Sequence, residues 1–395
     1  MSANVTLSAA TRQNLLSLQD TAALTSTTQN RLSTGKKVNS ALDNPLNFFT
    51  AQSLSSRSSD IGSLLDGISN GVQAIQAANQ GITSIQKLVD QAKSIGSQAL
   101  ATQITTTGTA KAFTAATAST TVSFYLNGAA TSSTFGSASS VTDVVNSLNS
   151  ASVAAGVGNA FTIDATGTKV VLAASADVEF ADSASQTALG FSAGAGTGPK
   201  YGTASTAGTS SEITVSGVTQ RASLASQYNN LLTQITQLAK DASFNGVNLI
   251  AGKKNDLNIN FNPKGDSNLT VNSTDETASG LGLTAVTNGA GAAAGTGNFL
   301  LNTDINATIK TLGMATDQLK ADSTTLGSNL SVVQNRQDFS KQLINVLDTG
   351  AANLTNADLN EEAANSQALA TRQSLGISAL SLANTAQQSI LQLLR

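Results

Sequence analysis

The chain has 395 residues, a formal net charge of −3 and charged side chains at only 11% of positions, against roughly 25% in an average domain. It contains no Cys, no His and no Trp. The absence of His and Cys excludes Ser-His-Asp and Cys-His catalytic centres and any zinc site built on imidazole or thiolate. The weak negative charge gives no basic field, so nucleic acid is not an expected partner. No stretch approaches about 18 consecutive apolar residues, the length that a transmembrane helix needs.

The first residues, MSANVTLSAATRQNLLSLQ, have neither a basic region nor an uninterrupted apolar region. We therefore expect no cleavable secretory signal. The lack of Cys suits an exported chain that must pass through a channel without cross-linking. Many cytosolic chains also lack Cys, so the compartment stays open on composition alone.

A long helix is predicted from about Pro45 to about Ala101. Asp43-Asn44-Pro45 offers an N-cap followed by a proline in the first turn. Apolar residues then recur every seven positions, which is the pattern of a coiled coil. The row consists of Ile61, Ile68, Ile75, Ile82 and Val89, with Leu64, Ala78, Ile85 and Ala92 at the companion spacing.

Glycines interrupt this predicted helix, among them those at positions 62, 67, 71 and 81. Each costs about 1 kcal/mol relative to Ala in a helix interior. Two interpretations remain open: the glycines allow backbones to approach closely, or they keep the isolated chain easy to unfold. Both favour a protein that assembles.

A second long row of apolar residues lies far downstream, between residues 305 and 354. Two helices of matching length most simply pair antiparallel in one rod, and the alternative is two amphipathic helices of a globular core. Length favours the rod, since globular helices typically run about 8–20 residues. The row consists of Ile305, Leu312, Leu319, Leu326, Val333, Leu347 and Leu354, interrupted by Ser340, with Ile309, Leu330 and Ile344 as companions.

The two chain ends carry shorter apolar rows. Between Gln373 and Leu394 there is no charged side chain, although an exposed helix face normally carries Lys, Glu and Arg. The C-terminal helix is therefore predicted to contact other subunits on almost every face. The N-terminal row is Leu15, Leu18, Ala22 and Leu32, and the C-terminal row is Leu375, Ala379, Leu382, Ala386 and Leu393.

The middle of the chain is rich in Ala, Ser, Thr and Gly, with short alternating runs that predict a compact α+β insert over about 102–217. A helix follows from Ser223 to about Ala242, then an Asn-Gly turn and a strand over 256–261. The Gly/Ala run 289–297 is interpreted as a connection. The predicted elements of the insert are the strands 121–126, 160–164 and 169–172 and a helical turn at 141–148.

No candidate catalytic, cofactor-binding or metal-binding residue emerges. There is no phosphate-binding loop of the Gly-x-x-x-x-Gly-Lys type, and the glycines at 194, 196 and 198 are interpreted as linker. The polar alternation from Asp256 to Asn262 lacks the glycine of a calcium loop and is interpreted as one polar strand face. Glu361 and Glu362 are interpreted as a solvated helix turn. No cofactor is expected, and the chain is predicted not to be an enzyme.

Four motifs, in order, resemble those of bacterial flagellin. The first is Asn30-Arg-Leu-Ser-Thr-Gly-Lys-Lys-Val-Asn-Ser-Ala-Leu-Asp-Asn-Pro45, similar to the family signature that ends the terminal helix and begins the long one. The others are Phe244-Asn-Gly-Val-Asn-Leu-Ile250, Val333-Gln-Asn-Arg336 and the ending from Ala368 to Arg395. The resemblance covers about 1–102 and 219–395. One departure is that the large insert precedes the Phe-Asn-Gly motif, whereas the variable domain commonly follows it.

The resemblance implies a mainly α fold with an α+β insert, in which a long antiparallel coiled coil from both chain ends carries a β-hairpin and an outer β-rich domain. The implied domains are 1–45 with 355–395 as terminal coiled-coil helices of an inner tube, 46–102 with 219–354 as the helical core, and 103–218 as the outer variable domain. It also implies a secreted, extracellular subunit that polymerises into the flagellar filament and gives motility.

The implied partners are further copies of the chain, an export chaperone, the filament cap and the hook-filament junction proteins. Export would proceed unfolded through the flagellar type III apparatus. Neither nucleic-acid binding nor membrane insertion is implied. Three alternatives stay open: a hook-filament junction protein, a secreted adhesin, and an insert with peptidase activity, which the absence of His disfavours.

Overall fold

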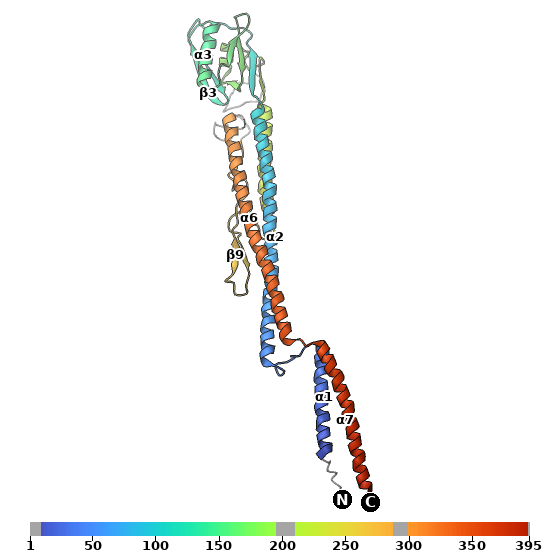
Figure 1. Cartoon of the computed structure of the whole chain (residues 1–395). Coiled ribbons are helices and arrows are strands. Elements are labelled where there is room, and N and C mark those ends of the chain that lie inside the picture. The colour runs from blue at the N-terminus through green and yellow to red at the C-terminus, as the bar shows by residue number, and fades with distance from the viewer. Residues whose placement is uncertain (1–8, 195–209, 287–298, 300, 394–395) are drawn as a thin grey trace. The chain divides into compact units, whose positions relative to one another are not determined.

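The computed structural model describes residues 9–194, 210–286, 299 and 301–393 of the chain (Figure 1). The chain divides into two units. Unit 1 contains Met1–Ser69, Asn260–Asn268 and Gln334–Arg395, and unit 2 contains Asn70–Ile259 and Leu269–Val333. The predicted connection 289–297, and the glycines at 196 and 198, lie outside the described residues.

Helix α2 (Pro45–Ala101) has the predicted bounds. The Asn44 side-chain oxygen accepts the backbone N–H of Asn47 at 3.1 Å, so Asn44 is the N-cap that the sequence indicated. Every member of the seven-residue row from Ile61 to Val89 is buried. The heptad pattern therefore identified the buried stripe of this helix correctly.

Helix α6 (Asn302–Thr355) also follows its predicted row, and Ser340, which interrupts the row, is buried as well. Within unit 2, the Ser323 hydroxyl of α6 donates to the Asn79 side-chain oxygen of α2 at 2.7 Å. A Cβ added to Gly96 of α2 would lie 2.9 Å from the Ile309 side chain. Within unit 1, Leu54 of α2 lies against Gly350 of α6.

The α2 glycines at positions 62, 67, 71 and 81 fall into two groups. A Cβ at Gly71 would meet the Ile259 side chain at 2.5 Å, and one at Gly81 would meet Ala242 and Ile250 at 2.7 Å. A Cβ at Gly62 or Gly67 would have nothing within 4 Å. The close-packing interpretation is therefore supported for Gly71 and Gly81, whereas no other part of the chain itself approaches Gly62 or Gly67 closely.

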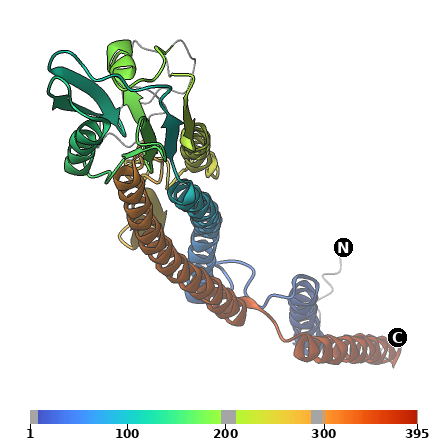
Figure 2. The same cartoon turned by 90° about the horizontal axis from the view of Figure 1, so that it is seen from above.

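The insert is an α+β body with two antiparallel sheets, as Figures 1 and 2 show, and this agrees with the predicted class. Its helices are α3 (Val141–Ala154), opened by a Ser140/Asp143 capping box, and α4 (Ser183–Ala188). Phe124, Phe161 and Leu172 are fully buried in its core. One sheet has the order β4 (Phe161–Ile163), β5 (Val170–Ala174), β1 (Thr105–Thr109) and β7 (Ile213–Ser216), and the other β3 (Ala129–Phe135), β2 (Thr120–Leu126) and β6 (Val178–Phe180).

The insert is connected to α2 and α5 through its neighbouring strands β1 and β7. These strands pair antiparallel, with Thr105 opposite Ser216. Buried Arg221, in the first turn of α5 (Val218–Asp241), donates from Nε to the Thr102 carbonyl at 2.7 Å. Gly217 precedes α5 with φ +87°, and a Cβ there would collide with the Gln103 carbonyl. These contacts fix the place where the insert enters and leaves the helices.

The Asn-Gly turn forms as predicted. Asn245 and Gly246 have φ of 48° and 81°, and Phe244 and Val247 exchange two backbone hydrogen bonds of 2.9 Å. The following hairpin pairs β8 (Leu257–Asn260) with β9 (Asn268–Val271). Asn258 and Asn260 are exposed around buried Ile259, which is the one polar strand face expected from the sequence.

Candidate assembly surface

Helices α1 (Ala9–Thr34) and α7 (Leu359–Leu393) lie side by side in unit 1 (Figures 1 and 2). The α1 stripe that is partly or fully buried is mostly hydroxylic. The Thr21 and Thr25 hydroxyls donate to the carbonyls four residues earlier, at 2.8 and 2.7 Å, so each is satisfied within its own helix. The buried and half-buried stripe consists of Thr11, Asn14, Leu18, Thr21, Thr25, Thr28 and Arg31.

The leucines of α1 mostly point away from this stripe. Leu15, Leu16, Leu24 and Leu32 are exposed. Of the row predicted from the sequence, only Leu18 turns inward, where it lies 2.6 Å from the position that a Cβ on Gly376 of α7 would take. The apolar periodicity was real, but it belongs to the outward face of the helix.

Helix α7 shows the same arrangement. Leu375 and Leu382 are 66% and 73% exposed, and Ile377 is exposed beside them. Its inward stripe is mixed in character, and Leu393, the last member of the predicted row, is not among the side chains that the structure describes. The inward stripe consists of Glu362, Ser366, Leu369, Gln373, Gly376 and Leu380.

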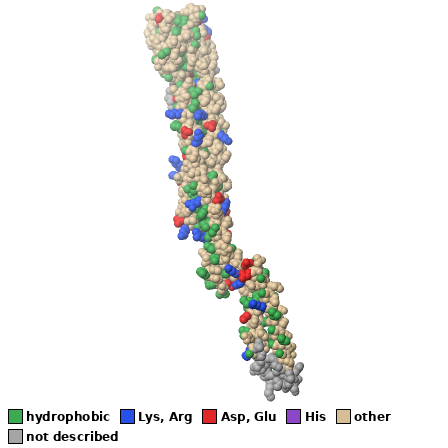
Figure 3. Space-filling view, viewed as in Figure 1, with side chains coloured by type: hydrophobic (Ala, Val, Ile, Leu, Met, Phe, Trp, Pro, Cys, Tyr) green, Lys and Arg blue, Asp and Glu red, His purple; other side chains and the backbone are tan. Residues whose placement is uncertain are grey.

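Exposed large apolar side chains concentrate in unit 1. Among the described residues, Val153, Met314 and Val332 are the only such side chains in unit 2. Figure 3 shows hydrophobic side chains over the visible surface of α1 and α7. Exposed apolar side chains that gather on one part of a molecule can mark a protein–protein contact, so α1 and α7 are candidates for one.

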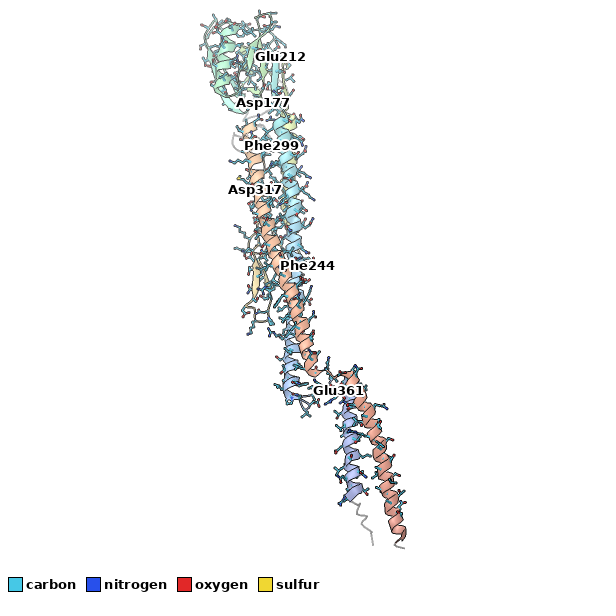
Figure 4. All side chains as sticks on the ribbon, in the orientation of Figure 1. Asp177, Glu212, Phe244, Phe299, Asp317 and Glu361 are labelled. Atoms are coloured by element: carbon cyan, nitrogen blue, oxygen red, sulfur yellow. The ribbon has the colours of Figure 1, made fainter. Side chains whose placement is uncertain are left out.

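One ion pair joins α1 to α7. An Arg31 guanidinium nitrogen lies 3.1 Å from the Glu362 carboxylate. Glu362 is buried, whereas Glu361, labelled in Figure 4, is exposed. The prediction of a solvated carboxylate pair was therefore wrong for Glu362, because its basic partner is distant in the sequence.

The segments that join α1 to α2 and α6 to α7 hydrogen-bond to each other within unit 1. Lys37 and Val38 donate their backbone N–H groups to the Thr355 carbonyl at 2.8 and 3.2 Å, and Ala357 donates to Gly35 at 2.9 Å. The Asp43 carboxylate accepts from the N–H groups of Ser40 and Asn39, which lowers its pKa. Residues 35–43, which belong to the segment that resembles the family signature, thus have a defined conformation.

The described residues contain no group of three or more acidic, His or Cys side chains able to hold a metal ion. A 440 Å³ groove between α2 and α5 is lined by Gln, Asn, Ser, Ile and Leu, without a titratable group.

Burial raises the pKa of Tyr228, which packs on Phe299, to about 12. Phe299 is labelled in Figure 4. None of the described helices is long and apolar enough to cross a membrane.

Two family models match the ends of the chain. Residues 5–135 match the bacterial flagellin N-terminal helical region, and residues 309–394 match the bacterial flagellin C-terminal helical region. Together these two regions span more than half of the chain. The chain belongs to the bacterial flagellin family.

Individual flagellins support this assignment. Flagellin FljM of Caulobacter vibrioides is 38% identical over 172 residues, which cover 44% of this chain and 59% of that protein. A flagellin of Brucella melitensis is 29% identical, over 44% of this chain and 61% of that protein. Flagellin C of Rhizobium meliloti is 42% identical over 19% of this chain and 24% of its own length. The chain thus aligns with about three-fifths of the length of the first two.

The family matches include the helices that carry the candidate assembly surface. The N-terminal match contains α1, the joining segment and α2, and the C-terminal match contains α7 and most of α6. Residues 136–308 lie outside both matches. The second half of the insert, α5 and the hairpin are therefore assigned on the sequence motifs and the structure alone.

Proposed function

We propose that the chain is a structural subunit that polymerises into the bacterial flagellar filament and so serves motility. The observation that carries this proposal is the orientation of α1 and α7. Each helix turns a polar or mixed stripe toward the other, and most of the described leucines of both helices stay exposed. Burying a leucine contributes about 1.5–3 kcal/mol, so the outward faces favour association with further copies.

The paired segments of both ends form antiparallel coiled coils in this proposal. In unit 2, Asn79 of α2 contacts Ser323 of α6, while the later residue Gly96 contacts the earlier residue Ile309. In unit 1, Leu18 contacts Gly376 and Arg31 contacts Glu362. Residue numbers rise along one helix as they fall along the other, which supports antiparallel pairing.

The proposed domains are those expected from the sequence. Residues 1–45 and 355–395 form the inner tube of the filament, 46–102 and 219–354 the helical core, and 103–218 the outer domain. The pairing of residues 35–38 with 355–357 supports a boundary at that level. Exposed rows cannot be buried in a lone subunit, so unfolded export before assembly suits these termini.

The partners follow from membership of the family. Further copies of the chain are the main partner, and an export chaperone, a filament cap and junction proteins act during assembly. The site of action is extracellular, in the filament. The chain performs no catalysis in this proposal, which rests on its membership of a family of filament proteins.

A double substitution on α7 tests the proposed surface. Leu375→Gln with Leu382→Gln replaces two exposed leucines, so the monomer should keep its helical content and unfolding temperature. Seeded polymerisation, followed by electron microscopy and sedimentation, should fall at least tenfold. Met314→Gln, an exposed apolar residue of unit 2, is the matched control and should polymerise normally.

The same assay separates the alternatives. Long hollow filaments from purified wild-type chain support the filament subunit. Short caps or rings that stop growing would point to a junction protein, and a chain that stays monomeric under all seeding conditions would favour an adhesin. Normal filaments from the double variant would refute the role given to α7.

A further inference from the structure

An ion pair joins the last turn of α1 to the first turn of α7. A guanidinium nitrogen of Arg31 donates to a carboxylate oxygen of Glu362 at 3.1 Å. The Arg31 side chain is 39% exposed and the Glu362 side chain 9% exposed, so the acid is the enclosed partner. The second carboxylate oxygen of Glu362 is buried and has no hydrogen-bond partner among the described residues. Within that part of the chain, Arg31 is therefore the group that holds this carboxylate.

The place of each charge on its helix adds to the attraction. A cation is favoured at the C-terminal end of a helix and an anion at the N-terminal end, because of the helix dipole. Arg31 and Glu362 occupy those two ends. An exposed ion pair contributes little to stability, but loss of one partner from an enclosed pair leaves a charge without compensation. The contact between Arg31 and Glu362 should therefore resist any motion that parts these two ends.

The threonines of the inward α1 stripe are weak determinants of how the two helices face each other. The hydroxyls of Thr21 and Thr25 donate within α1, at 2.8 and 2.7 Å, so they need no partner from α7. On α7, no charged residue follows Arg372 until the final Arg395. Neutral side chains of this kind pack against several faces of a partner helix. A further contact must decide which face is used.

The backbone hydrogen bonds of the joining segments fix a different property of the pair. Residues 35–38 bond with residues 355–357 at 2.8 to 3.2 Å. These residues flank α1 and α7, so their bonds set how far the two helices slide along each other. They lie outside both helices and leave the rotation of each helix about its own axis to side-chain contacts.

This rotation decides what the helices offer to other molecules. Leu15 of α1 is exposed, as are Leu375 and Leu382 of α7. If both helices turned until their leucines met, the apolar surface would be buried within one chain. That surface would then be lost to further copies. The same rotation would carry Arg31 and Glu362 out of contact.

We propose, on the basis of the filament function given above, that Arg31 and Glu362 lock the rotation of α1 and α7. The lock keeps the threonine stripe inward and the leucines outward, so that a subunit does not satisfy its own apolar faces. Arg31 and Glu362 are positioning residues in this scheme, because they act through the leucines that contact the next copy. Their charges thus determine whether a subunit is competent to assemble.

Exchange of the two charges tests the lock in the full-length chain. Arg31→Glu and Glu362→Arg each place two like charges together, so seeded elongation, followed by electron microscopy and light scattering, should fall at least tenfold. The double variant, which carries both changes, restores opposite charges and should recover most of that loss, although the reversed charges oppose the helix dipoles. Asp20→Asn and Arg372→Gln remove exposed charges from the same helices and should elongate normally. A double variant that assembles no better than either single variant would overturn the lock.

Engineered cysteine pairs report the rotation directly, since the chain contains no Cys. In the antiparallel pairing proposed above, Leu18 lies against Gly376. Thr25 and Leu369 each lie seven residues from that contact, toward the joining segments, and both point inward. In filaments of the otherwise wild-type chain, Thr25→Cys with Leu369→Cys should therefore oxidise to a disulfide within one chain.

The opposite rotation is reported by Leu15→Cys with Ala379→Cys. Both residues are exposed and lie three residues from the Leu18–Gly376 contact, toward the chain ends. No disulfide within the chain should form while the lock is intact, whereas adding Glu362→Gln should produce one. A cross-linking pattern that Glu362→Gln leaves unchanged would overturn the proposal. If the wild-type chain forms no filament, the filament function fails, and the same two cysteine pairs test the lock in the monomer.

Discussion

Asp177 is a buried acid of unit 2, in the turn between β5 and β6 of the insert (Figure 4). It is 1% exposed, and among the described residues neither of its carboxyl oxygens has a hydrogen-bond partner. Burial raises its pKa from 3.8 to about 7. The folded chain therefore holds a proton on Asp177 that the unfolded chain has released above about pH 4.

The sign of the resulting pH dependence follows from linkage. Stability of the insert is full below about pH 4, falls as the pH rises, and reaches its minimum above about pH 7. Asp177→Asn is neutral at every pH, so it should stabilise the insert at pH 8 by roughly 2–4 kcal/mol, at about 1.4 kcal/mol per pKa unit. Calorimetry at pH 5 and pH 8 measures this.

The control for this prediction is Asp90→Asn, which removes an exposed acid from α2. It should leave the pH dependence of the insert transition unchanged. If the wild-type insert is equally stable at pH 5 and pH 8, the Asp177 carboxylate must be solvated when ionised.

At the scale of a helix, the glycines make a matched pair of predictions. Gly81→Ala places a methyl 2.7 Å from the Ala242 Cβ, which cannot rotate away, so unit 2 should lose about 1–3 kcal/mol. Gly313→Ala on α6 meets nothing within 4 Å and should gain about 1 kcal/mol from helix propensity. Urea unfolding of the two variants measures both changes, and a stabilised Gly81→Ala would contradict the packing described for α2.

The helices could be predicted closely because their signal is periodic and long. The row from Ile61 to Val89 repeats over several heptads, and Asn44-Pro45 marks the start, so both ends of α2 were located. The predictions for β2, β4 and β5 were close for a similar reason, because aromatic and β-branched residues alternate there. By contrast, β3 and β1 consist mainly of Ala, Ser, Thr and Gly, and their pairing is decided by partner strands distant in the sequence.

The orientation of the terminal helices could not be predicted for a different reason. Period alone locates an apolar stripe but does not say whether the chain's own partner helix covers it. On α1 the stripe of Thr21, Thr25 and Thr28 competes with the leucine stripe, and the threonines are the ones turned inward. The Arg31–Glu362 ion pair could not be predicted either, because no sequence pattern links two residues so far apart in the chain.

At the scale of the whole molecule, the placement of the insert decides what can be removed. The insert enters by β1 and leaves by β7, and Thr106 lies opposite Val215 in that pairing. The chain therefore enters the insert and leaves it at two residues that are neighbours in the sheet. Residues 107–214 can be replaced by an Asn-Gly turn, which favours a tight hairpin between paired strands.

This shortened chain should still form filaments, because α1, α2, α6 and α7 keep their sequences and the exposed leucines of unit 1 are untouched. Electron microscopy after seeding should show thinner filaments that grow at a rate within about twofold of wild type, since outer surface adds little to a contact made by buried apolar faces. Adding Leu375→Gln and Leu382→Gln to the shortened chain should abolish assembly. That result would show that the same contacts hold together the filaments of the wild-type chain and of the shortened chain. If the shortened chain folds by circular dichroism and yet forms no filament, the insert itself carries contacts between subunits.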